Sequence, residues 1–209
     1  MSKELYDTSM EIIEKILNQP KYEKLVLMLE ELFVKTHISI TEIDKERRVL
    51  WGYYYEKTIV TPIAEKGNKD LLDLIYQENE IDLYHYKFLK NKTLSVYMVK
   101  KVKKDNFMVY DIFNKKKVIT LPLTDDWFGI NKGDLIQSCL YNSEEPYLSS
   151  YGFIHPKGVD KFILKKAKEI IKSKNFYYND EFLAKLFRKF VNSMRYSRKD
   201  ALELYNIDL

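Results

Sequence analysis

The sequence predicts an α+β protein in which helices precede and follow a small antiparallel β-barrel. Apolar residues recur with a helical period up to about residue 92, alternate with a period of two from Thr93 to Pro156, and then return to the helical period. Short separators rich in Asn, Asp, Lys and Gly divide the middle segment. We therefore expect an N-terminal helical region over 1–92, a small barrel or curled sheet over 93–156, and a C-terminal helical region over 157–209.

The N-terminal region is predicted to be mainly helical. The expected helices are Glu4–Leu17, Lys21–Lys35, a third from Thr41 through Tyr54, Asp70–Asn79 and Ile81–Leu89. Thr41 and Asp44 give the third helix a Thr-x-x-Asp start that resembles a capping box. The segment Thr58–Ile63 is β-branched and interrupted by Pro62, so we expect a short extended connection there, followed by a helical turn over 62–65.

The middle region is predicted to contain strands joined by hairpin-length connections. Five strands are expected, over Leu94–Lys100, Phe107–Phe113, Lys117–Leu123, Asp134–Tyr141 and Tyr147–Ile154. Five short strands of this kind favour an SH3-like or OB-like antiparallel barrel, because closure limits the exposed edges. After the barrel we expect a helix over Val159–Ile171, a second capped by Asn179, and a third over Arg198–Tyr205 capped by Ser197.

The composition excludes several classes of protein. The chain has 209 residues, of which 45% are hydrophobic and 14% aromatic, which is too apolar for a disordered chain. No apolar run approaches about 18 residues, so we expect a cytoplasmic protein that does not enter the membrane. Cys139 is the only cysteine, which excludes an internal disulfide and a cysteine-cluster zinc site, and its apolar neighbours predict a small core residue. With six glycines and no phosphate-binding loop, we expect no cofactor.

The net charge of +4 conceals an uneven distribution of charge along the chain. Residues 1–83 carry 11 basic and 17 acidic side chains, whereas 84–117 carry 10 and 2, and 157–199 carry 13 and 4. Basic segments of this kind can contact nucleic acid or an acidic partner. The excess of lysine over arginine is equally typical of an AT-rich genome, and lysine contacts phosphate only as a point charge.

The order of short elements from Arg47 to Pro156 resembles uncharacterised bacterial proteins often found with a SEC-C zinc motif. The elements that carry the resemblance are Trp51-Gly52-Tyr53-Tyr54, Thr61-Pro62-Ile63, the strand Leu94–Val99, Tyr110-Asp111 and Gly133-Asp134-Leu135. The resemblance covers about half the chain and implies helices around an SH3-like or OB-like barrel. It implies no activity, and the SEC-C motif itself is absent, so zinc binding does not follow from it.

Three residues are candidates for catalysis, and each also has a structural interpretation. His155 stands at the end of a predicted strand, where an imidazole could act as a general base, but no nucleophile or orienting carboxylate lies near it in sequence. Asp111 and Asp134 lie in or beside strands, where Asp usually bonds to the backbone of a turn. Asp82 and His85, with Glu78 one turn earlier, have metal-ligand spacing on a helix, but no second such pair appears, so no metal site is predicted.

The sequence also predicts the residues of a nucleic-acid site. It combines the hairpin cations Lys100, Lys101, Lys103, Lys104, Lys115, Lys116 and Lys117 with the interleaved aromatic residues Tyr97, Tyr110 and Phe113. Small barrels hold single strands in this way, by stacking bases on aromatic rings beside cations that contact phosphate. The alternative is that the rings pack the core while the lysines solvate the hairpin tips.

From the sequence we expect a non-enzymatic adaptor or accessory protein that presents an interaction surface to a protein partner. The alternative function is a nucleic-acid-binding module that uses the lysine-rich hairpins. A small hydrolase or metal-dependent enzyme ranks third, and would require Asp111, Asp134 and His155 to share one pocket.

Overall fold

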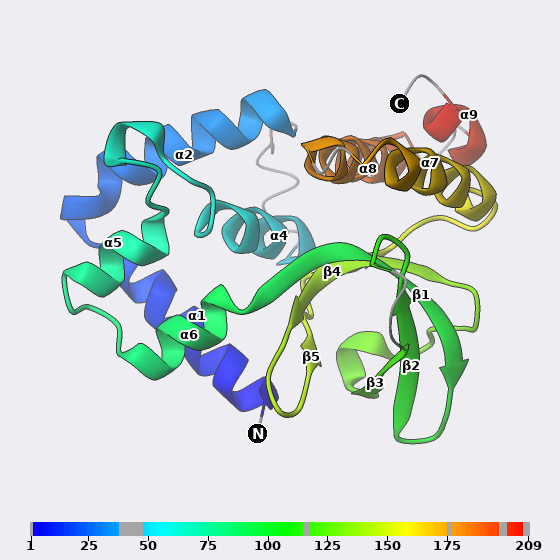
Figure 1. Ribbon diagram of the computed structural model, residues 1–209, viewed down its shortest axis with the longest axis horizontal. Coiled ribbons are helices and arrows are strands. Elements are labelled where there is room, and N and C mark those ends of the chain that lie inside the picture. Colours follow the sequence, from blue (N-terminus) through cyan, green and yellow to red (C-terminus); the bar gives the residue numbers. More distant parts are fainter. Residues whose placement is uncertain (1, 38–47, 115–117, 175–176, 197–199, 207–209) are drawn as a thin grey trace. The chain divides into compact units, whose positions relative to one another are not determined.

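The computed structural model describes residues 2–37, 48–114, 118–174, 177–196 and 200–206 (Figure 1). Within these ranges the protein is an α+β fold with eight α-helices and a six-stranded sheet that curls into a small antiparallel barrel. The fold class predicted from the sequence is therefore confirmed, with helices before and after the barrel. In this part of the chain, no helix combines the length and the apolar character needed to cross a membrane.

The helices and strands have the following bounds. The α-helices are α1 (Ser2–Leu17), α2 (Glu23–Thr36), α4 (Arg48–Thr58), α5 (Leu71–Gln77), α6 (Leu83–Lys90), α7 (Asp160–Ser173), α8 (Tyr177–Arg195) and α9 (Ala201–Asn206). The strands are β1 (Lys92–Val102), β2 (Asn106–Asp111), β3 (Val118–Pro122), β4 (Leu135–Tyr141), β5 (Tyr147–Leu148) and β6 (Phe153–Ile154). Short 3-10 turns are η1 (Pro20–Tyr22), η2 (Ala64–Lys66) and η3 (Asp125–Trp127).

The chain packs as two compact units that interleave along the sequence. Unit 1 consists of Met1–Lys35, Ser39–Thr93 and Cys139–Tyr151. Unit 2 consists of Thr36–Ile38, Leu94–Ser138 and Gly152–Leu209. The β4–β5 hairpin is thus the only strand pair that belongs to unit 1 among the described residues, and it joins helices from far earlier in the chain.

Unit 1 builds its helices on local signals that lie close to those expected. Asp70 caps α5, with its side chain accepting from the Asp73 backbone N–H while the Asp73 carboxylate accepts from that of Asp70. Asp82 caps α6 by accepting from the backbone N–H of His85 at 2.9 Å. The third expected helix is present as α4, but its expected capping box at Thr41 and Asp44 lies outside the described residues.

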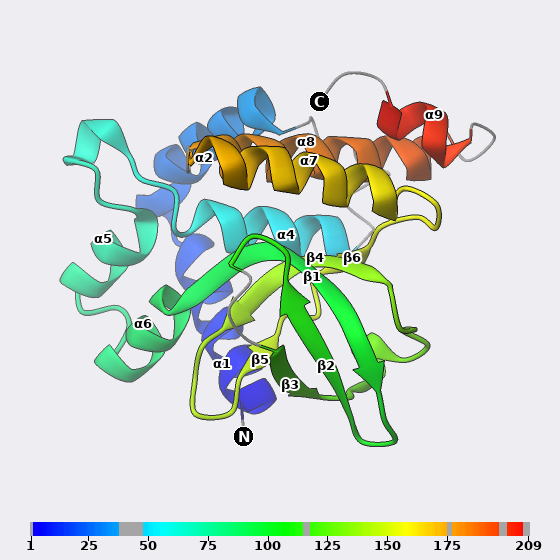
Figure 2. The same cartoon turned by 45° about the vertical axis from the view of Figure 1, so that its right-hand side comes forward.

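Unit 2 contains most of the sheet, in which the strand order is β3-β2-β1-β4, with β6 also paired to β4. β1 and β2 form an antiparallel hairpin in which Val99 faces Val109, and the register shifts between Val99 and Lys101. An apolar cluster packs this sheet against the C-terminal helices. Its buried members are Val96, Ile112, Leu135, Val159, Ile163, Ala167, Phe182, Leu183, Leu186, Leu204 and Tyr205. Helices α7 and α8 lie side by side in both ribbon views (Figures 1 and 2).

The prediction of one continuous fifth strand over Tyr147–Ile154 is wrong. Two short strands replace it: β5 pairs with the end of β4, and β6 pairs with its beginning. The break has a local cause, because the Ser149 hydroxyl accepts from the backbone N–H of Tyr151 and bends the chain. At Gly152 the backbone also comes so close to Ser138 that an added Cβ would lie 2.4 Å from the Ser138 Cβ.

Other elements also begin or end at different residues from those predicted. α4 continues to Thr58, whose hydroxyl donates to the Tyr54 carbonyl, so the extended connection after it is shorter than predicted. The expected turn at 62–65 is present as η2, two residues later. The last helix is described from Ala201 onward, and its expected cap, Ser197, lies outside the described residues.

Candidate functional site

The three sequence-predicted catalytic candidates each make separate structural contacts. Asp111 accepts from the Ser95 hydroxyl at 2.7 Å and from the backbone N–H of Phe113 at 2.9 Å, so it closes the turn after β2. Asp134 accepts from the backbone N–H of Asn131 at 2.7 Å, which closes the turn before β4. No hydrogen bond joins any two of Asp111, Asp134 and His155, all of which the structure describes.

His155 is buried after β6 and bonds to the C-terminal helix α9. Its Nδ1 lies 2.9 Å from the Tyr205 hydroxyl, and its Nε2 has no hydrogen-bond partner among the described residues. Burial lowers the pKa of His155 to about 3, so the ring is neutral at physiological pH. The imidazole therefore holds α9 against the sheet.

The residues with metal-ligand spacing, Asp82, His85 and Glu78, also make structural contacts. His85 Nδ1 lies 2.8 Å from the Ser9 hydroxyl, while Asp82 caps α6. Glu78 accepts from Lys21 at 2.9 Å and from the Tyr22 hydroxyl at 2.8 Å. Among the described residues, no group of three His, Cys, Asp or Glu side chains is placed to hold a metal ion.

The lysines of the β1–β2 hairpin are exposed, whereas its aromatic side chains are largely covered. The exposed cations are Lys100, Lys101, Lys103 and Lys104; Lys115, Lys116 and Lys117 lie outside the described residues. Tyr97 is fully buried. Tyr110 and Phe113 are half-buried against the apolar cluster of unit 2, with the Lys100 ammonium 4.8 Å from the centre of the Tyr110 ring.

The structure brings together a buried polar cluster in unit 1 that no sequence motif indicated. Glu56 of α4 is 1% exposed. Its Oε1 accepts from the hydroxyl of Tyr6 at 3.0 Å and from that of Tyr141 at 2.9 Å. The Tyr6 hydroxyl also lies 3.0 Å from the Ser149 hydroxyl. We call Tyr6, Glu56, Tyr141 and Ser149 the Glu56 cluster.

Burial dominates the electrostatics of the Glu56 cluster. It raises the pKa of Glu56 above its usual value, although the nearby Lys92 charge and the hydroxyl donors oppose the shift. The pKa of Tyr6 and of Tyr141 is also raised by burial and then by the Glu56 charge, so both phenols stay protonated and act as donors. The cluster is a set of matched donors and acceptors inside the protein.

Two further groups border the cluster. Lys92 donates from Nζ to the Glu56 backbone carbonyl at 2.7 Å, and burial lowers the pKa of this amine. Cys139 is buried, as its sequence environment predicted. Burial followed by the Glu56 charge raises the pKa of the Cys139 thiol, so the group stays protonated and is a poor nucleophile.

A surface pocket of about 600 Å³ lies directly against the cluster, and Tyr6 belongs to both. Its walls come from α1, α4 and the loop after β5. They consist of Lys3, Tyr6, Asp7, Met10, Glu11, Ile13, Glu14, Gly52, Tyr55 and Tyr151. The pocket therefore combines three tyrosine rings and a methionine with three carboxylates and one cation, all four charged groups coming from α1.

The acidic side of the pocket is partly unneutralised. Glu11 and Glu14 are exposed, and neither makes an ion pair with a residue that the structure describes. Tyr55 is half-buried, and its pKa is raised by burial and then by the negative charges of Glu14 and Glu30. The Glu14 carboxylate therefore places negative charge near the Tyr55 ring.

Gly52 is required for the shape of the pocket. A Cβ at this helical position would lie 1.8 Å from Cγ of Tyr151 and so would overlap the tyrosine ring. The Tyr151 ring in turn contacts that of Tyr6, with 6.1 Å between the ring centres. The absence of a side chain at residue 52 thus allows the aromatic wall to form.

Sequence reasoning missed Glu56, although one signal was present. Glu56 stands three residues after Tyr53 and three before Ile59, and both of these are buried, so helical spacing places the carboxylate on the buried face of α4. Tyr6 and Tyr141, the donors that satisfy it, lie 50 and 85 residues away in sequence. Local patterns carry no information about such contacts.

The protein is thus an α+β protein whose small barrel and helical unit are built from interleaved segments of the chain, with a pocket in the helical unit. Comparison with protein-family models, with curated proteins and with solved structures found no match.

Proposed function

We propose that the protein is a non-enzymatic adaptor, and that the pocket formed by α1, α4 and the loop after β5 holds a basic side chain of a partner protein. The observation that carries the proposal is a pocket of about 600 Å³ in which three tyrosine rings lie with the carboxylates of Glu11 and Glu14, neither of which pairs with a described residue. A lysine or arginine side chain suits this lining, because its stem packs against aromatic surface while its charge meets carboxylates and ring faces.

Two features of the side chains outside the pocket support a protein partner. Tyr97 is buried, so it is not displayed as a platform for stacked bases. α2, also in unit 1, exposes apolar side chains at Leu27, Leu32 and Val34, which are 54%, 36% and 41% exposed. Leu27 and Val34 are seven residues apart and therefore lie on one side of α2, where exposed apolar surface favours a protein partner.

The chemistry of the Glu56 cluster supports a binding role over a catalytic one. Glu56 Oε1 is occupied by two phenol donors, and the thiol of Cys139 is kept protonated by burial. A general base needs a reachable proton and a nucleophile needs exposure. The cluster instead fixes Tyr6, one wall of the pocket, in a single orientation.

The test uses Met10, which lines the pocket, as a local probe. The full-length protein is labelled with ¹³C in its methionine methyl groups, and the Met10 signal is assigned from a Met10→Leu variant. N-acetyl-arginine amide is then titrated, with N-acetyl-glutamine amide as the uncharged comparison. We expect a saturable shift of the Met10 signal with the arginine compound and a much smaller one with the glutamine compound.

Matched variants separate pocket binding from general charge effects. The double variant Glu11→Gln, Glu14→Gln should abolish the saturable shift, whereas Glu31→Gln, which removes an exposed charge on α2, should leave it unchanged. Short random peptides selected on the protein should then share a basic residue and lose affinity for the double variant. Equal responses to both amides, or none, would refute the basic-side-chain proposal.

A further inference from the structure

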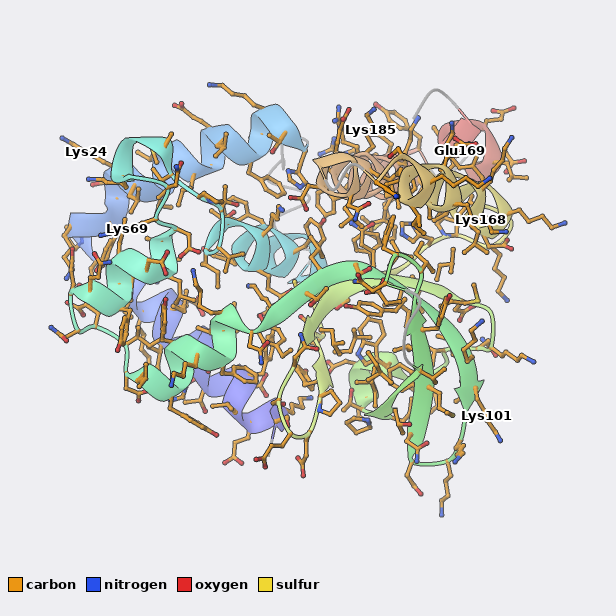
Figure 3. All side chains as sticks on the ribbon, viewed as in Figure 1. Lys24, Lys69, Lys101, Lys168, Glu169 and Lys185 are labelled. Atoms are coloured by element: carbon orange, nitrogen blue, oxygen red, sulfur yellow. The ribbon has the colours of Figure 1, made fainter. Side chains whose placement is uncertain are left out.

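A stripe of exposed lysines runs along α7 in unit 2. Lys161, Lys165, Lys168 and Lys172 follow one another at intervals of four, three and four residues, and all four are exposed. At 100° per residue they fall within an arc of about 60°, and the stripe is about 16 Å long. We call these four residues the α7 lysine stripe. Figure 3 shows Lys168 on α7 with its side chain extending away from the ribbon.

The opposite face of α7 fixes the orientation of the stripe. Ile163 and Ala167 are buried in the apolar cluster of unit 2, and Phe162, Leu164 and Ile170 pack partly against it. A helix with one face in the core cannot rotate to hide its charges. The four lysines are therefore held in line on one outward face of α7, from which their flexible side chains project.

The charges of the stripe are not neutralised by neighbouring acids. None of the four lysines makes an ion pair with a described residue, and Glu169, which follows Lys168 in the sequence, pairs with Lys166 at 3.1 Å. Like charges three and four residues apart on a helix destabilise it. The arrangement thus weakens α7 by itself and would be relieved by a bound polyanion.

We propose that the α7 lysine stripe binds the phosphate backbone of a nucleic-acid duplex. Over about 16 Å of duplex axis each strand presents about five phosphates, at 3.4 Å per phosphate, which matches four lysines in a line. Lysine contacts phosphate as a point charge and reads no base, so binding should not depend on sequence. This site shares no residue with the adaptor pocket or with the β1–β2 hairpin.

The surroundings of the stripe favour a duplex over the alternatives. No fully exposed aromatic side chain accompanies the stripe on the described part of α7, so single-stranded bases have no ring on which to stack. The apolar face of α7 is committed to the core, so the helix cannot insert that face into a lipid surface. A duplex requires neither feature, because its phosphates lie on the outside.

The experiment measures binding of the full-length protein to a fluorescein-labelled DNA duplex by anisotropy between about 50 and about 200 mM salt. Four phosphate contacts predict that affinity falls about a hundredfold over this range. The variant Lys165→Glu, Lys168→Glu should reduce that loss to about tenfold or abolish binding, because at most two contacts remain. A matched control, Lys24→Glu, Lys66→Glu, removes the same charge from exposed positions of unit 1 and should bind like the wild type, whereas the hairpin variant Lys100→Glu, Lys101→Glu tests the competing site.

Each other outcome overturns the proposal. No binding at low salt, or loss of binding only in the hairpin variant, would remove α7 as the site. Tighter binding to a single strand of equal length, or binding only to vesicles that contain phosphatidylserine, would assign the stripe to a different ligand. Circular dichroism checks that the variant keeps its helices, and Lys165→Gln, Lys168→Gln provides a milder form of the same test.

Discussion

The two units differ in their overall charge and in the groups that they bury. Unit 1 carries 14 basic and 19 acidic side chains and buries a carboxylate among phenols, whereas unit 2 carries 21 and 12 and is centred on an apolar cluster. An apolar core tolerates substitutions of similar volume, but a buried polar cluster requires every donor and acceptor to be present. The comparison indicates that unit 1 adds a cluster of specific buried hydrogen bonds around a carboxylate to its apolar packing, and we expect this cluster to be its most sensitive point.

The largest effect is expected from removing the centre of the Glu56 cluster. Glu56→Ala leaves the Tyr6 and Tyr141 hydroxyls without their acceptor and opens a cavity, so it should lower the free energy of unfolding by about 3 to 5 kcal/mol. Urea denaturation followed by circular dichroism measures the loss. Glu56→Gln keeps an acceptor oxygen and should cost about 1 kcal/mol or less at neutral pH. A similar loss in both variants would contradict a hydrogen-bonding role.

The difference in stability between the wild type and Glu56→Gln should change with pH in a definite direction. Because burial raises the pKa of Glu56, the folded state binds its proton more tightly than the unfolded state does. The wild type should therefore gain stability relative to Glu56→Gln as the pH falls from about 7 toward the ordinary value of 4.5. Urea midpoints across that range test it, and a constant difference would show that Glu56 titrates normally.

Glycine substitutions test packing in both units. Gly52→Ala adds a methyl group 1.8 Å from the Tyr151 ring, and Gly152→Ala adds one 2.4 Å from the Ser138 Cβ. Each should cost about 1 to 3 kcal/mol, even though alanine favours a helix at residue 52 by about 1 kcal/mol. Only Gly52→Ala should also shift the Met10 methyl signal. Combining it with Tyr151→Ala should cost less than the sum of the two single changes if the ring is the obstacle.

His155 should give unit 2 an acid sensitivity of its own. Burial lowers its pKa from 6.5 to about 3, so the unfolded state takes up the proton first and stability is lost as the pH falls below 6.5. The expected slope is about 1.4 kcal/mol per pH unit relative to His155→Gln, which can still bond to Tyr205 but does not titrate. Parallel pH profiles for the two proteins would show that the imidazole is exposed to solvent.

The smallest change in stability is expected from a substitution in the α7 lysine stripe. Lys168→Glu replaces repulsion from Lys165 and Lys172 with attraction, and should raise the free energy of unfolding by about 0.5 to 1 kcal/mol at low salt. Salt should erase the gain by screening. Lys101→Glu, on a strand opposite Met108, is the control and should change stability by less than about 0.5 kcal/mol.

The sequence predicted what depends on local patterns. The change of apolar period located the barrel between two helical regions, and Cys139 is buried as its neighbours indicated. The fifth strand was wrong because its bend depends on one side chain, Ser149, and on the close approach of Gly152 to Ser138. Neither feature changes the alternation of apolar residues, so periodicity could not show it.

The candidate site was less predictable than the fold. The pocket needs α1, α4 and the loop after β5 together, and the order of the sequence does not bring them together. Its acidic residues Glu11 and Glu14 resemble any solvated helix face until Tyr55 and Tyr151 are placed beside them. Assignment of nucleic-acid binding to the hairpin remains a prediction, and the structure adds that Tyr97 is buried.

The interleaving of the two units also affects how the chain is made. Glu56 is synthesised well before Tyr141 and Ser149, which belong to the same unit. At about 5 to 20 residues per second, the ribosome needs about 3 to 12 seconds to pass from Thr93 to Tyr151. During that interval the first helices exist without two of the partners of their buried carboxylate. The buried face of α4 therefore lacks these partners until the β4–β5 hairpin that completes unit 1 has been made.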